Sequence, residues 1–279
     1  DQGDSWNDPA GYVYGCMNQL FKLKKKNRYL KTSLSFGGWT LSTNFSTIAA
    51  TDAGRKTFVT SAVNMMLQYG FDGIDIDWEY PGVDTGMGNV VSPNDGTNFT
   101  LLLQEFRNQF SAIPGGRTWL LSIAAPAGKE KYSKLELAKI SGLVDFINLM
   151  AYDYAGSWTS KTGHQSNLYP NATSALSTDA TISDYIAAGF DPKKIVLGYP
   201  TYGRGWTGVV NNNNGFNQTY TGLSAGSWEQ GMYDYKAIID TLIPAGYKVF
   251  WDSAAQQSYL WSAAKQEMVA FDDALTVYT

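Results

Sequence analysis

Four carboxylates stand close together in FDGIDIDWEY, residues 71–80, which otherwise has the apolar content of a buried strand. Side chains alternate along a strand, so Asp75, Asp77 and Glu79 share one face, and Asp72 lies on the other. Carboxylates this close together raise the pKa of at least one member of the group. A carboxylic acid that keeps its proton near neutral pH is suited to general acid catalysis. We therefore predict an acid–base centre on this face and a structural role for Asp72.

Other interpretations of the acidic row have less support. A metal ion would find its ligands in a line, and neither a histidine nor a calcium-binding loop completes a cage. A solvated acidic face would leave the alternating Ile74, Ile76 and Trp78 half exposed. The sequence has one histidine, His164, and one cysteine, Cys16, which argues against a zinc site, a Ser-His-Asp triad or an internal disulfide. We expect no metal and no cofactor, and we interpret Cys16 as a core thiol.

The composition predicts a large, soluble, globular protein. The chain has 279 residues, 44% of them hydrophobic, and a net charge of -4, so it can bury a core but has no electrostatic footprint for nucleic acid. No apolar run approaches the ~20 residues that cross a membrane, and no signal peptide is visible at Asp1. Four Asn-X-Ser/Thr triplets predict secretion through a glycosylating pathway, with the signal already removed. They begin at Asn44, Asn98, Asn171 and Asn217.

Alternating helices and strands surround the acidic stretch. Nearly continuous apolar runs predict strands at 30–36, 71–78, 118–125, 143–152 and 194–200, which favours a parallel sheet covered by helices. Three helices are predicted at 12–26, 58–66 and 99–110. A capping box at Ser133 and Glu136 predicts a short fourth helix, and caps at Thr181 and Asp184 predict a fifth that ends at Gly189.

The alternation of predicted helices and strands ends after Tyr202. Short strand patterns around one helical segment predict an α+β insertion over residues 206–272, with the NNNN run at 211–214 as a loop tip. We predict a partial (β/α) barrel over residues 1–205, continued by 273–279.

The motif D-x-x-D-x-D-x-E at residues 72–79 resembles the signature of glycoside hydrolase family 18, the chitinases. The resemblance covers essentially the whole chain and is closest to the fungal-type chitinases that carry an insertion domain. It implies an α/β fold of the (β/α)8 TIM-barrel type, with Glu79 at the mouth formed by the carboxyl ends of the strands. Three further motifs resemble the family's strand ends, in the family's order: Ser35-Phe36-Gly37-Gly38-Trp39, Met150-Ala151-Tyr152-Asp153 and Tyr202-Gly203-Arg204.

The resemblance implies hydrolysis of β-1,4 linkages between N-acetylglucosamine units of chitin by a substrate-assisted retaining mechanism. Glu79 would protonate the glycosidic oxygen, Asp77 would orient the attacking acetamido group, and Asp75 would hold the shared proton. Tyr152 would hydrogen-bond the acetamido oxygen, and Ser35 would support Asp75. The sugar subsites would be lined by Tyr80, Met150, Asp153 and Arg204, and by Trp39 and Trp158, whose rings we expect to stack on sugars.

The chain departs from a complete barrel at both ends. Only 29 residues precede the first predicted strand, whereas two earlier strand–helix units would need on the order of 60. We therefore expect the first two strands and the last strand of the barrel to be missing. Open strand edges invite pairing with other chains, which predicts either self-association through these edges or packing that covers them.

Three functions stay open at this point. One is a chitinase that acts on long chains, favoured by the insertion and by Trp39 and Trp158. The second is a truncated, weak or inactive chitin-binding protein of the same fold, although Glu79, whose loss usually marks such proteins, is present. The third is an endo-N-acetylglucosaminidase that cuts glycoprotein glycans.

Overall fold

The protein is described by a computed structural model, which covers residues 13–115 and 118–278 and divides into two compact units. The first unit comprises the chain up to Ala125, with Ser133–Asn148 and Lys193–Ile195. The second comprises Pro126–Tyr132, Leu149–Pro192 and the chain from Val196 onward. All of 206–272 falls in the second unit, and the domain boundary between residues 205 and 206 stays a prediction. No helix of the described residues is long and apolar enough to cross a membrane.

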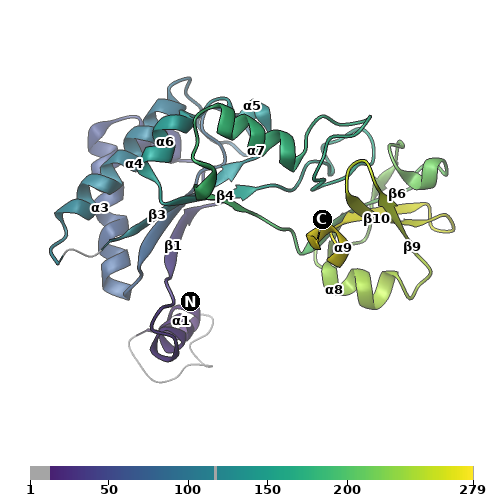
Figure 1. The fold of residues 1–279 in the computed structure, drawn as a ribbon, viewed down its shortest axis with the longest axis horizontal. Coiled ribbons are helices and arrows are strands. Elements are labelled where there is room, and N and C mark those ends of the chain that lie inside the picture. The colour runs from purple at the N-terminus through teal and green to yellow at the C-terminus, as the bar shows by residue number, and fades with distance from the viewer. Residues whose placement is uncertain (1–12, 116–117, 279) are drawn as a thin grey trace. The chain divides into compact units, whose positions relative to one another are not determined.

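A parallel sheet carries the acidic stretch. Its strand order is β1-β2-β3-β4-β5, and the printed registers of β1 with β2 and of β2 with β3 are parallel. The predicted α/β fold is therefore confirmed, and each strand overlaps a predicted range, with β1 and β3 ending one residue beyond it (Figure 1). The strands are β1 (Ser33–Gly37), β2 (Gly73–Asp77), β3 (Leu120–Pro126), β4 (Phe146–Met150) and β5 (Ile195–Leu197). Over the described residues this order has β1 at one end and β5 at the other.

The first unit also contains α-helices. They are α1 (Gly15–Lys26), α2 (Phe45–Ala49), α3 (Asp52–Tyr69), α4 (Asp95–Ala112) and α6 (Leu137–Leu143). Figure 1 shows α3, α4 and α6 on one side of the strands. Helix α3 begins after Thr51, whose side chain accepts a hydrogen bond from the Gly54 N–H, and ends at Gly70, whose φ of 71° is left-handed.

Two expectations for this unit are wrong. Cys16 is exposed, because α1 buries only Gly15, so the thiol is not part of a core. Ser133 and Glu136 do not form a capping box, since Glu136 itself is the N-cap residue of α6 and its side chain bonds Lys139 instead of a backbone N–H. A short helix follows Ser133 as predicted, but it begins at Leu137 and not next to Ser133.

The second unit contains the helices α5 (Lys129–Tyr132) and α7 (Thr178–Ala187). The predicted cap of α7 is wrong, because Ser177 is the N-cap residue and accepts from the Ala180 N–H, which leaves Thr181 and Asp184 inside the helix. The predicted stop is correct within the precision of helix ends, since Gly189 follows at a φ of 88°.

An antiparallel sheet forms the rest of the second unit. Its order is β7-β6-β11-β10-β9, and β8 also pairs with β6. The short strand patterns predicted for residues 206–272 are confirmed by β9, β10 and β11, and residues 211–214 are exposed as expected of a loop tip. The bounds are β6 (Tyr202–Thr207), β7 (Gly222–Leu223), β8 (Met232–Asp234), β9 (Lys248–Asp252), β10 (Gln257–Ser262) and β11 (Glu267–Phe271).

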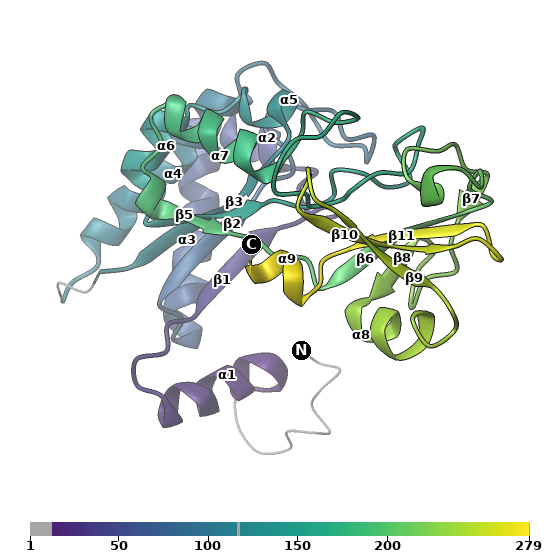
Figure 2. The ribbon, with the colours of Figure 1, turned by 45° about the vertical axis from the view of Figure 1, so that its right-hand side comes forward.

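Both faces of this sheet are apolar, which explains the unbroken apolar run in β11. Met268 and Ala270 pack on one face with Trp206 and Tyr259. The intervening positions pack on the other face, against the short helices α8 (Tyr235–Ala237) and η4 (Ile238–Leu242) (Figure 2). The remaining short elements are η2 (Pro192–Lys194), η3 (Asn213–Gly215) and α9 (Ala274–Tyr278).

Candidate active site

The apolar face of β2 fixes which way its carboxylates point. Ile74 and Ile76 are fully buried, and the Trp78 ring lies between Phe45 and Phe99 at centroid distances of 5.5 and 5.4 Å. Turning the strand over would expose this cluster to water, which the hydrophobic effect opposes. Alternation along the strand therefore directs the acidic row to the opposite face.

Asp72 has the structural role predicted for it. Its carboxylate is buried, accepts a hydrogen bond from the Thr32 N–H at 2.9 Å, and forms an ion pair with Lys24. It thus joins the entry of β1 to the entry of β2 and to helix α1. A buried charge with such partners is stabilised without any catalytic task.

Asp75 is held by a row of polar residues that crosses three strands. Ser35 of β1 and Ser122 of β3 are its direct register partners on either side. The Ser35 hydroxyl donates to Asp75 Oδ2 at 2.8 Å, and the Ser122 hydroxyl donates to Oδ1 at 2.6 Å. The Asn148 Nδ2 of β4 approaches Oδ1 at 3.4 Å. The carboxylate of Asp75 is therefore fixed in orientation from both sides.

Asp77 is a carboxyl of the acidic row whose pKa is strongly shifted. Burial, and after it the charges of Glu79 and Asp75, raise the pKa of Asp77 from 3.8 to about 7. Removal from water is a larger cause of this shift than the repulsion between carboxylates expected from the sequence. The Asp77 Oδ1 atom is buried and has no hydrogen-bond partner among the described residues. A carboxyl in this state can hold a proton and has one oxygen left for another molecule.

Glu79 follows the end of β2, and its backbone is anchored by Ser42. The Glu79 N–H donates to the Ser42 hydroxyl oxygen at 2.9 Å, and this oxygen lies 2.8 Å from the Gly38 carbonyl and 3.0 Å from the Asp77 carbonyl. The segment after β1 thereby sets the position of Glu79. Its side chain and that of Tyr80 are half-buried, and Trp39, next to Gly38, is 47% exposed.

A second polar group lies within the second unit. Asp153, which follows β4 and has a φ of 59°, accepts two hydrogen bonds from Arg204, at 2.9 Å from Nε and 2.8 Å from Nη2. The Tyr202 hydroxyl donates to the same carboxylate at 2.7 Å. The Arg204 guanidinium lies 5.2 Å from the Trp158 ring centroid, a cation–π distance. Trp158 remains 56% exposed, so a ligand can reach its ring.

Met150 and Tyr152 enter the second unit at the end of β4. The Tyr152 ring lies 6.3 Å from that of Tyr202 in an edge-on arrangement. A Cβ atom at Gly198 would lie 2.5 Å from the Leu149 carbonyl oxygen and 2.9 Å from a Tyr152 ring atom. Glycine at position 198 is therefore required for Tyr152 to keep its place.

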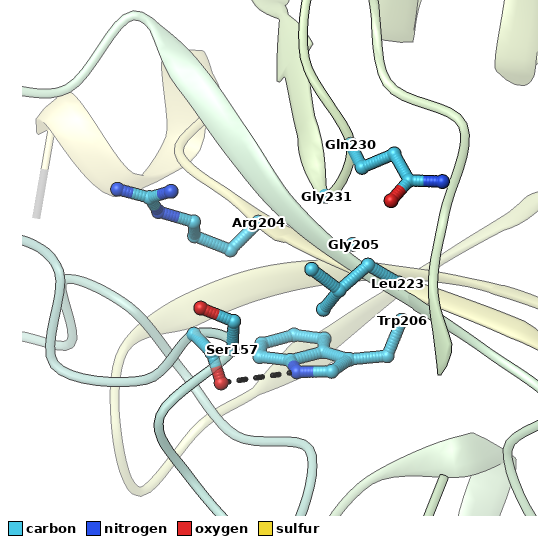
Figure 3. A pocket seen from close by; sticks show the side chains of 8 residues that line it. Ser157, Arg204, Gly205, Trp206, Leu223, Gln230 and Gly231 are labelled. Carbon is cyan, nitrogen blue, oxygen red and sulfur yellow. Dashed lines mark hydrogen bonds between the residues drawn. The ribbon is translucent and has the colours of Figure 1, made fainter. Parts of the chain in front are cut away.

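A small cavity of about 20 Å³, enough for one water molecule, adjoins Arg204. Figure 3 shows the Trp206 indole at this cavity, where it donates to the Gly156 carbonyl at 3.3 Å, with Gln230 across from it. The cavity is lined by Gly156, Ser157, Arg204, Gly205, Trp206, Leu223, Gln230 and Gly231.

The predicted site residues thus form two groups. Ser35, Asp75, Asp77 and Glu79 are brought together in the first unit, with Trp39 and Tyr80 beside them in sequence. The second group lies in the second unit, where Tyr152 contacts Tyr202 and Arg204 contacts both Asp153 and Trp158. Met150 belongs to the same unit.

Sequence reasoning missed several supporting residues. Ser122 and Asn148 both contact Asp75, and Ser42 anchors the backbone of Glu79. The available signal for the first two was a single polar residue inside an otherwise apolar strand. Ser42 follows the strand in a loop and gave no such signal.

Carboxylates at the end of a strand on a parallel α/β scaffold are an arrangement in which barrel glycosidases carry their catalytic acids. The model of the family "Glycosyl hydrolases family 18" matches residues 2–279, and the chain belongs to this family. Chitinase 1 of Aphanocladium album is 46% identical over 286 residues, covering 99% of this chain and 63% of that protein. The chain thus spans about three fifths of the length of this relative.

Solved structures agree with this assignment. The chitinase ChiA74 from Bacillus thuringiensis matches with a TM-score of 0.90 and 37% identity, over 94% of this chain and 45% of that one. The Ostrinia furnacalis Group IV chitinase, solved in complex with allosamidin, matches with a TM-score of 0.84 and 29% identity, over 93% and 71%. With the parallel sheet, these matches confirm a fold of the TIM-barrel type.

Proposed function

We propose that this chain carries the catalytic acid and part of the sugar-binding surface of a chitinase, which cleaves β-1,4 linkages between N-acetylglucosamine units with retention of configuration. The reaction is substrate-assisted, so the chain needs one acid and one group that orients the substrate's acetamido group, and no carboxylate nucleophile.

The observation that carries the proposal is the state of Asp77. Its pKa is raised to about 7, and its buried Oδ1 atom has no partner among the described residues. A buried polar atom without a partner is costly, and a ligand that supplies one is bound more tightly for it. An acetamido N–H, which is neutral and a hydrogen-bond donor, is a suitable partner.

The proposed chemistry proceeds in two steps. Glu79 gives its proton to the glycosidic oxygen while the acetamido carbonyl oxygen attacks the anomeric carbon, so the bond to the leaving sugar breaks and a cyclic oxazolinium ion forms. Asp77 accepts a hydrogen bond from the acetamido N–H and stabilises the positive charge that forms on this nitrogen. Asp75 interacts electrostatically with Asp77 and shares its proton. Glu79 then takes a proton from the water that opens the ring, which restores the starting configuration.

The second unit contributes the remaining contacts in this proposal. Tyr152 donates to the acetamido oxygen, and Trp158, held against Arg204, offers a ring on which a sugar can stack. Asp153 and Met150 are further sugar-binding residues of this unit, and Trp39 and Tyr80 are sugar-binding residues of the first unit. Aromatic rings at several positions favour long chitin chains over short sugars.

Secretion and self-association are further parts of the proposal. Asn44, which opens one of the four glycosylation triplets, is exposed, as an acceptor must be. Self-association through strand β1, an end strand of the sheet over the described residues, would pair its free edge. Sedimentation of the chain over a range of concentrations tests it, and a monomer at all concentrations would contradict it.

Hydrolysis of a fluorogenic N-acetylglucosamine oligomer tests the main proposal. We expect measurable activity from the parent chain and a loss of at least about 1000-fold in kcat for Glu79→Gln, because the acid is removed while its shape is kept. Glu130→Gln is the matched control, since Glu130 is an exposed glutamate of helix α5, and it should keep full activity. Full activity in Glu79→Gln would refute the mechanism.

Substrate choice and stereochemistry are tested in the same series. Proton NMR of the first product should show the β-anomer, as retention requires. Release of glycans from a glycoprotein, without hydrolysis of chitin oligomers, would instead indicate an endo-N-acetylglucosaminidase. Binding of oligomers without hydrolysis would indicate a chitin-binding protein of the same fold.

A further inference from the structure

Asp95, the first residue of helix α4, is a buried carboxylate outside the acidic row. The residue is 1% exposed, and its two oxygens accept three hydrogen bonds. Oδ1 accepts from the Ser46 hydroxyl at 2.7 Å. Oδ2 accepts from the Gly82 N–H at 3.2 Å and from the Ser92 N–H at 2.9 Å. All three donors lie outside α4, so these bonds hold the chain before the helix and fix the carboxylate in one orientation.

The two backbone donors are the ends of the loop 82–92, which follows the acid. Because both N–H groups bond the same oxygen of Asp95, this carboxylate holds the two ends of the loop together. Gly82 comes only three residues after Glu79. One of the two residues between them is the buried Pro81, whose ring fixes its own φ. A displacement of Gly82 is therefore transmitted directly to the backbone of Glu79.

The segment around helix α2 holds the other side of the acid. The Phe45 ring stacks on Trp78, the residue before Glu79, at a centroid distance of 5.5 Å. Ser46, the next residue of α2, supplies the hydroxyl that donates to the carboxylate in α4. Ser42, which precedes α2, accepts from the Glu79 N–H at 2.9 Å. The chain that carries the acid is thus fixed both before and after it, by contacts within the first unit.

The first turn of α4 is itself fixed against a neighbouring segment of the first unit. Gly96, the residue after Asp95, is buried, and a Cβ atom there would lie 1.9 Å from the Lys134 carbonyl oxygen. The backbone of the helix therefore lies directly against the backbone at Lys134, which leaves no room for a side chain. Asp95 cannot shift to follow a moving loop, so its carboxylate is a rigid anchor for the loop 82–92.

We propose that Asp95 is a positioning residue for the catalytic acid: by fixing the loop that follows Glu79, it keeps the acid within reach of the glycosidic oxygen. The inference rests on the proposed function and extends it to the support of the acid. A general acid works only within hydrogen-bond reach of the oxygen that it protonates, and a misplacement of about 1 Å can cost on the order of 100-fold in rate. Asp95 itself does not touch the substrate in this role.

A role in positioning the acid predicts a loss of rate that depends on the leaving group. A sugar is a poor leaving group and needs the proton of Glu79, whereas a dinitrophenolate ion is stable and leaves without one. A displaced acid therefore slows the cleavage of a chitin oligomer far more than that of a dinitrophenyl glycoside. A general loss of folded structure slows the cleavage of both substrates alike.

The test compares kcat/KM for N-acetylglucosamine hexamer and for a dinitrophenyl glycoside of the dimer, below the melting transition of each variant. Asp95→Ala should lower kcat/KM by on the order of 10- to 100-fold for the hexamer and by less than about threefold for the glycoside. Asp95→Asn should keep most of both activities, because its amide oxygen can accept from the two backbone N–H groups while its nitrogen donates to the Ser46 hydroxyl. Asp179→Ala is the matched control and should equal the parent, since Asp179 is an exposed aspartate in the first turn of α7.

The outcomes separate this role from the proposed function. Parental activity of Asp95→Ala on the hexamer, or equal losses on both substrates, overturns the positioning role and leaves the proposed function intact. No hydrolysis of either substrate by the parent overturns the proposed function, and the positioning role with it. If Asp95→Ala is insoluble, Ser46→Ala decides, because it removes one bond and keeps the carboxylate. A loss of about threefold or more that is confined to the hexamer then supports the role, and parental activity overturns it.

Discussion

The Ser122 hydroxyl donates a hydrogen bond to Asp75 Oδ1 at 2.6 Å, directly across from its register partner on the neighbouring strand. Ser35 makes the corresponding bond from the other side at 2.8 Å. Ser122 is only 1% exposed, whereas Ser35 is exposed. The two serines are therefore a matched pair that differs mainly in burial.

Removal of the buried hydroxyl should be the more costly change. We expect Ser122→Ala to lower the free energy of unfolding by about 1–3 kcal/mol, because a hydrogen bond to a charged group is lost where water cannot replace it. Ser35→Ala should cost less than about 1 kcal/mol, since water reaches the carboxylate there. Urea unfolding followed by tryptophan fluorescence measures both values. Equal costs would show that burial does not control the strength of these bonds.

Asp77 should make stability depend on pH in a defined direction. Its pKa is about 7 in the folded chain and near 3.8 when exposed, so the native state binds more protons between these values. Its contribution to the free energy of unfolding therefore falls as pH rises from about 4 to about 7. Asp77→Asn cannot ionise and should lose this dependence.

The measurement is the difference in urea midpoint between the parent and Asp77→Asn at a series of pH values. We expect the variant to gain relative stability as pH rises towards 7, with no further change above about 8. A difference that stays constant over this range would mean that the pKa of Asp77 is not raised in the folded chain.

The sequence predicted the elements and the acidic row because both follow from local periodicity. Alternation in FDGIDIDWEY separated Asp72 from Asp75, Asp77 and Glu79, and the packing of Trp78 confirms that separation. The cap of α7 was misplaced because Thr181 and Asp184 are helix-capping types, whereas Ser177, four residues earlier, makes the bond. Side-chain type alone does not choose between neighbouring caps.

Contacts between strands could not be predicted from the sequence. Ser122 joins Asp75 only because β3 pairs with β2 in one register, and Met232 lies beside Arg204 only through the register of β8 with β6. Cys16 was assigned to a core because helical periodicity shows which residues share a face, and not what covers that face. Register and coverage are properties of the folded chain.

Gly37 and Gly38 should differ sharply in their tolerance of a side chain. Both have positive φ, at 116° and 90°. A Cβ atom at Gly37 would lie 2.0 Å from the Asp77 carbonyl oxygen, whereas the nearest atom to one at Gly38 is Asp77 Oδ2 at 3.8 Å. Gly37→Ala should thus cost about 3 kcal/mol or more, and Gly38→Ala about 1–2 kcal/mol from backbone strain alone.

Thermal unfolding by circular dichroism compares these two variants with the parent. We expect a much lower melting temperature, or no soluble protein, for Gly37→Ala, and a modest shift for Gly38→Ala. Similar shifts in both would indicate that backbone strain, and not the contact with β2, is the cost at this strand end.

Arg204→Lys should weaken the second unit although the charge is kept. Lysine cannot form the two parallel bonds that the Arg204 guanidinium makes to Asp153, at 2.9 and 2.8 Å, and it offers no plane for the Trp158 ring. We expect a loss of about 1.5–3 kcal/mol in the free energy of unfolding, because charge-assisted bonds to a partly buried carboxylate are lost. Lys236→Arg is the control, since its pair with Asp240 is exposed, and it should cause no measurable change.

Hydrogen exchange of the amides of β6, measured by mass spectrometry, locates the effect of Arg204→Lys. Exchange should speed up in β6 and in the loop that carries Asp153 and Trp158, while β2 in the first unit should keep the protection of the parent. The same variant should also move the emission of Trp158, because the cation no longer lies over its ring. Unchanged exchange in β6 together with unchanged stability would mean that the Asp153 pair does not hold the loop in place, and the platform offered by Trp158 would then need another support.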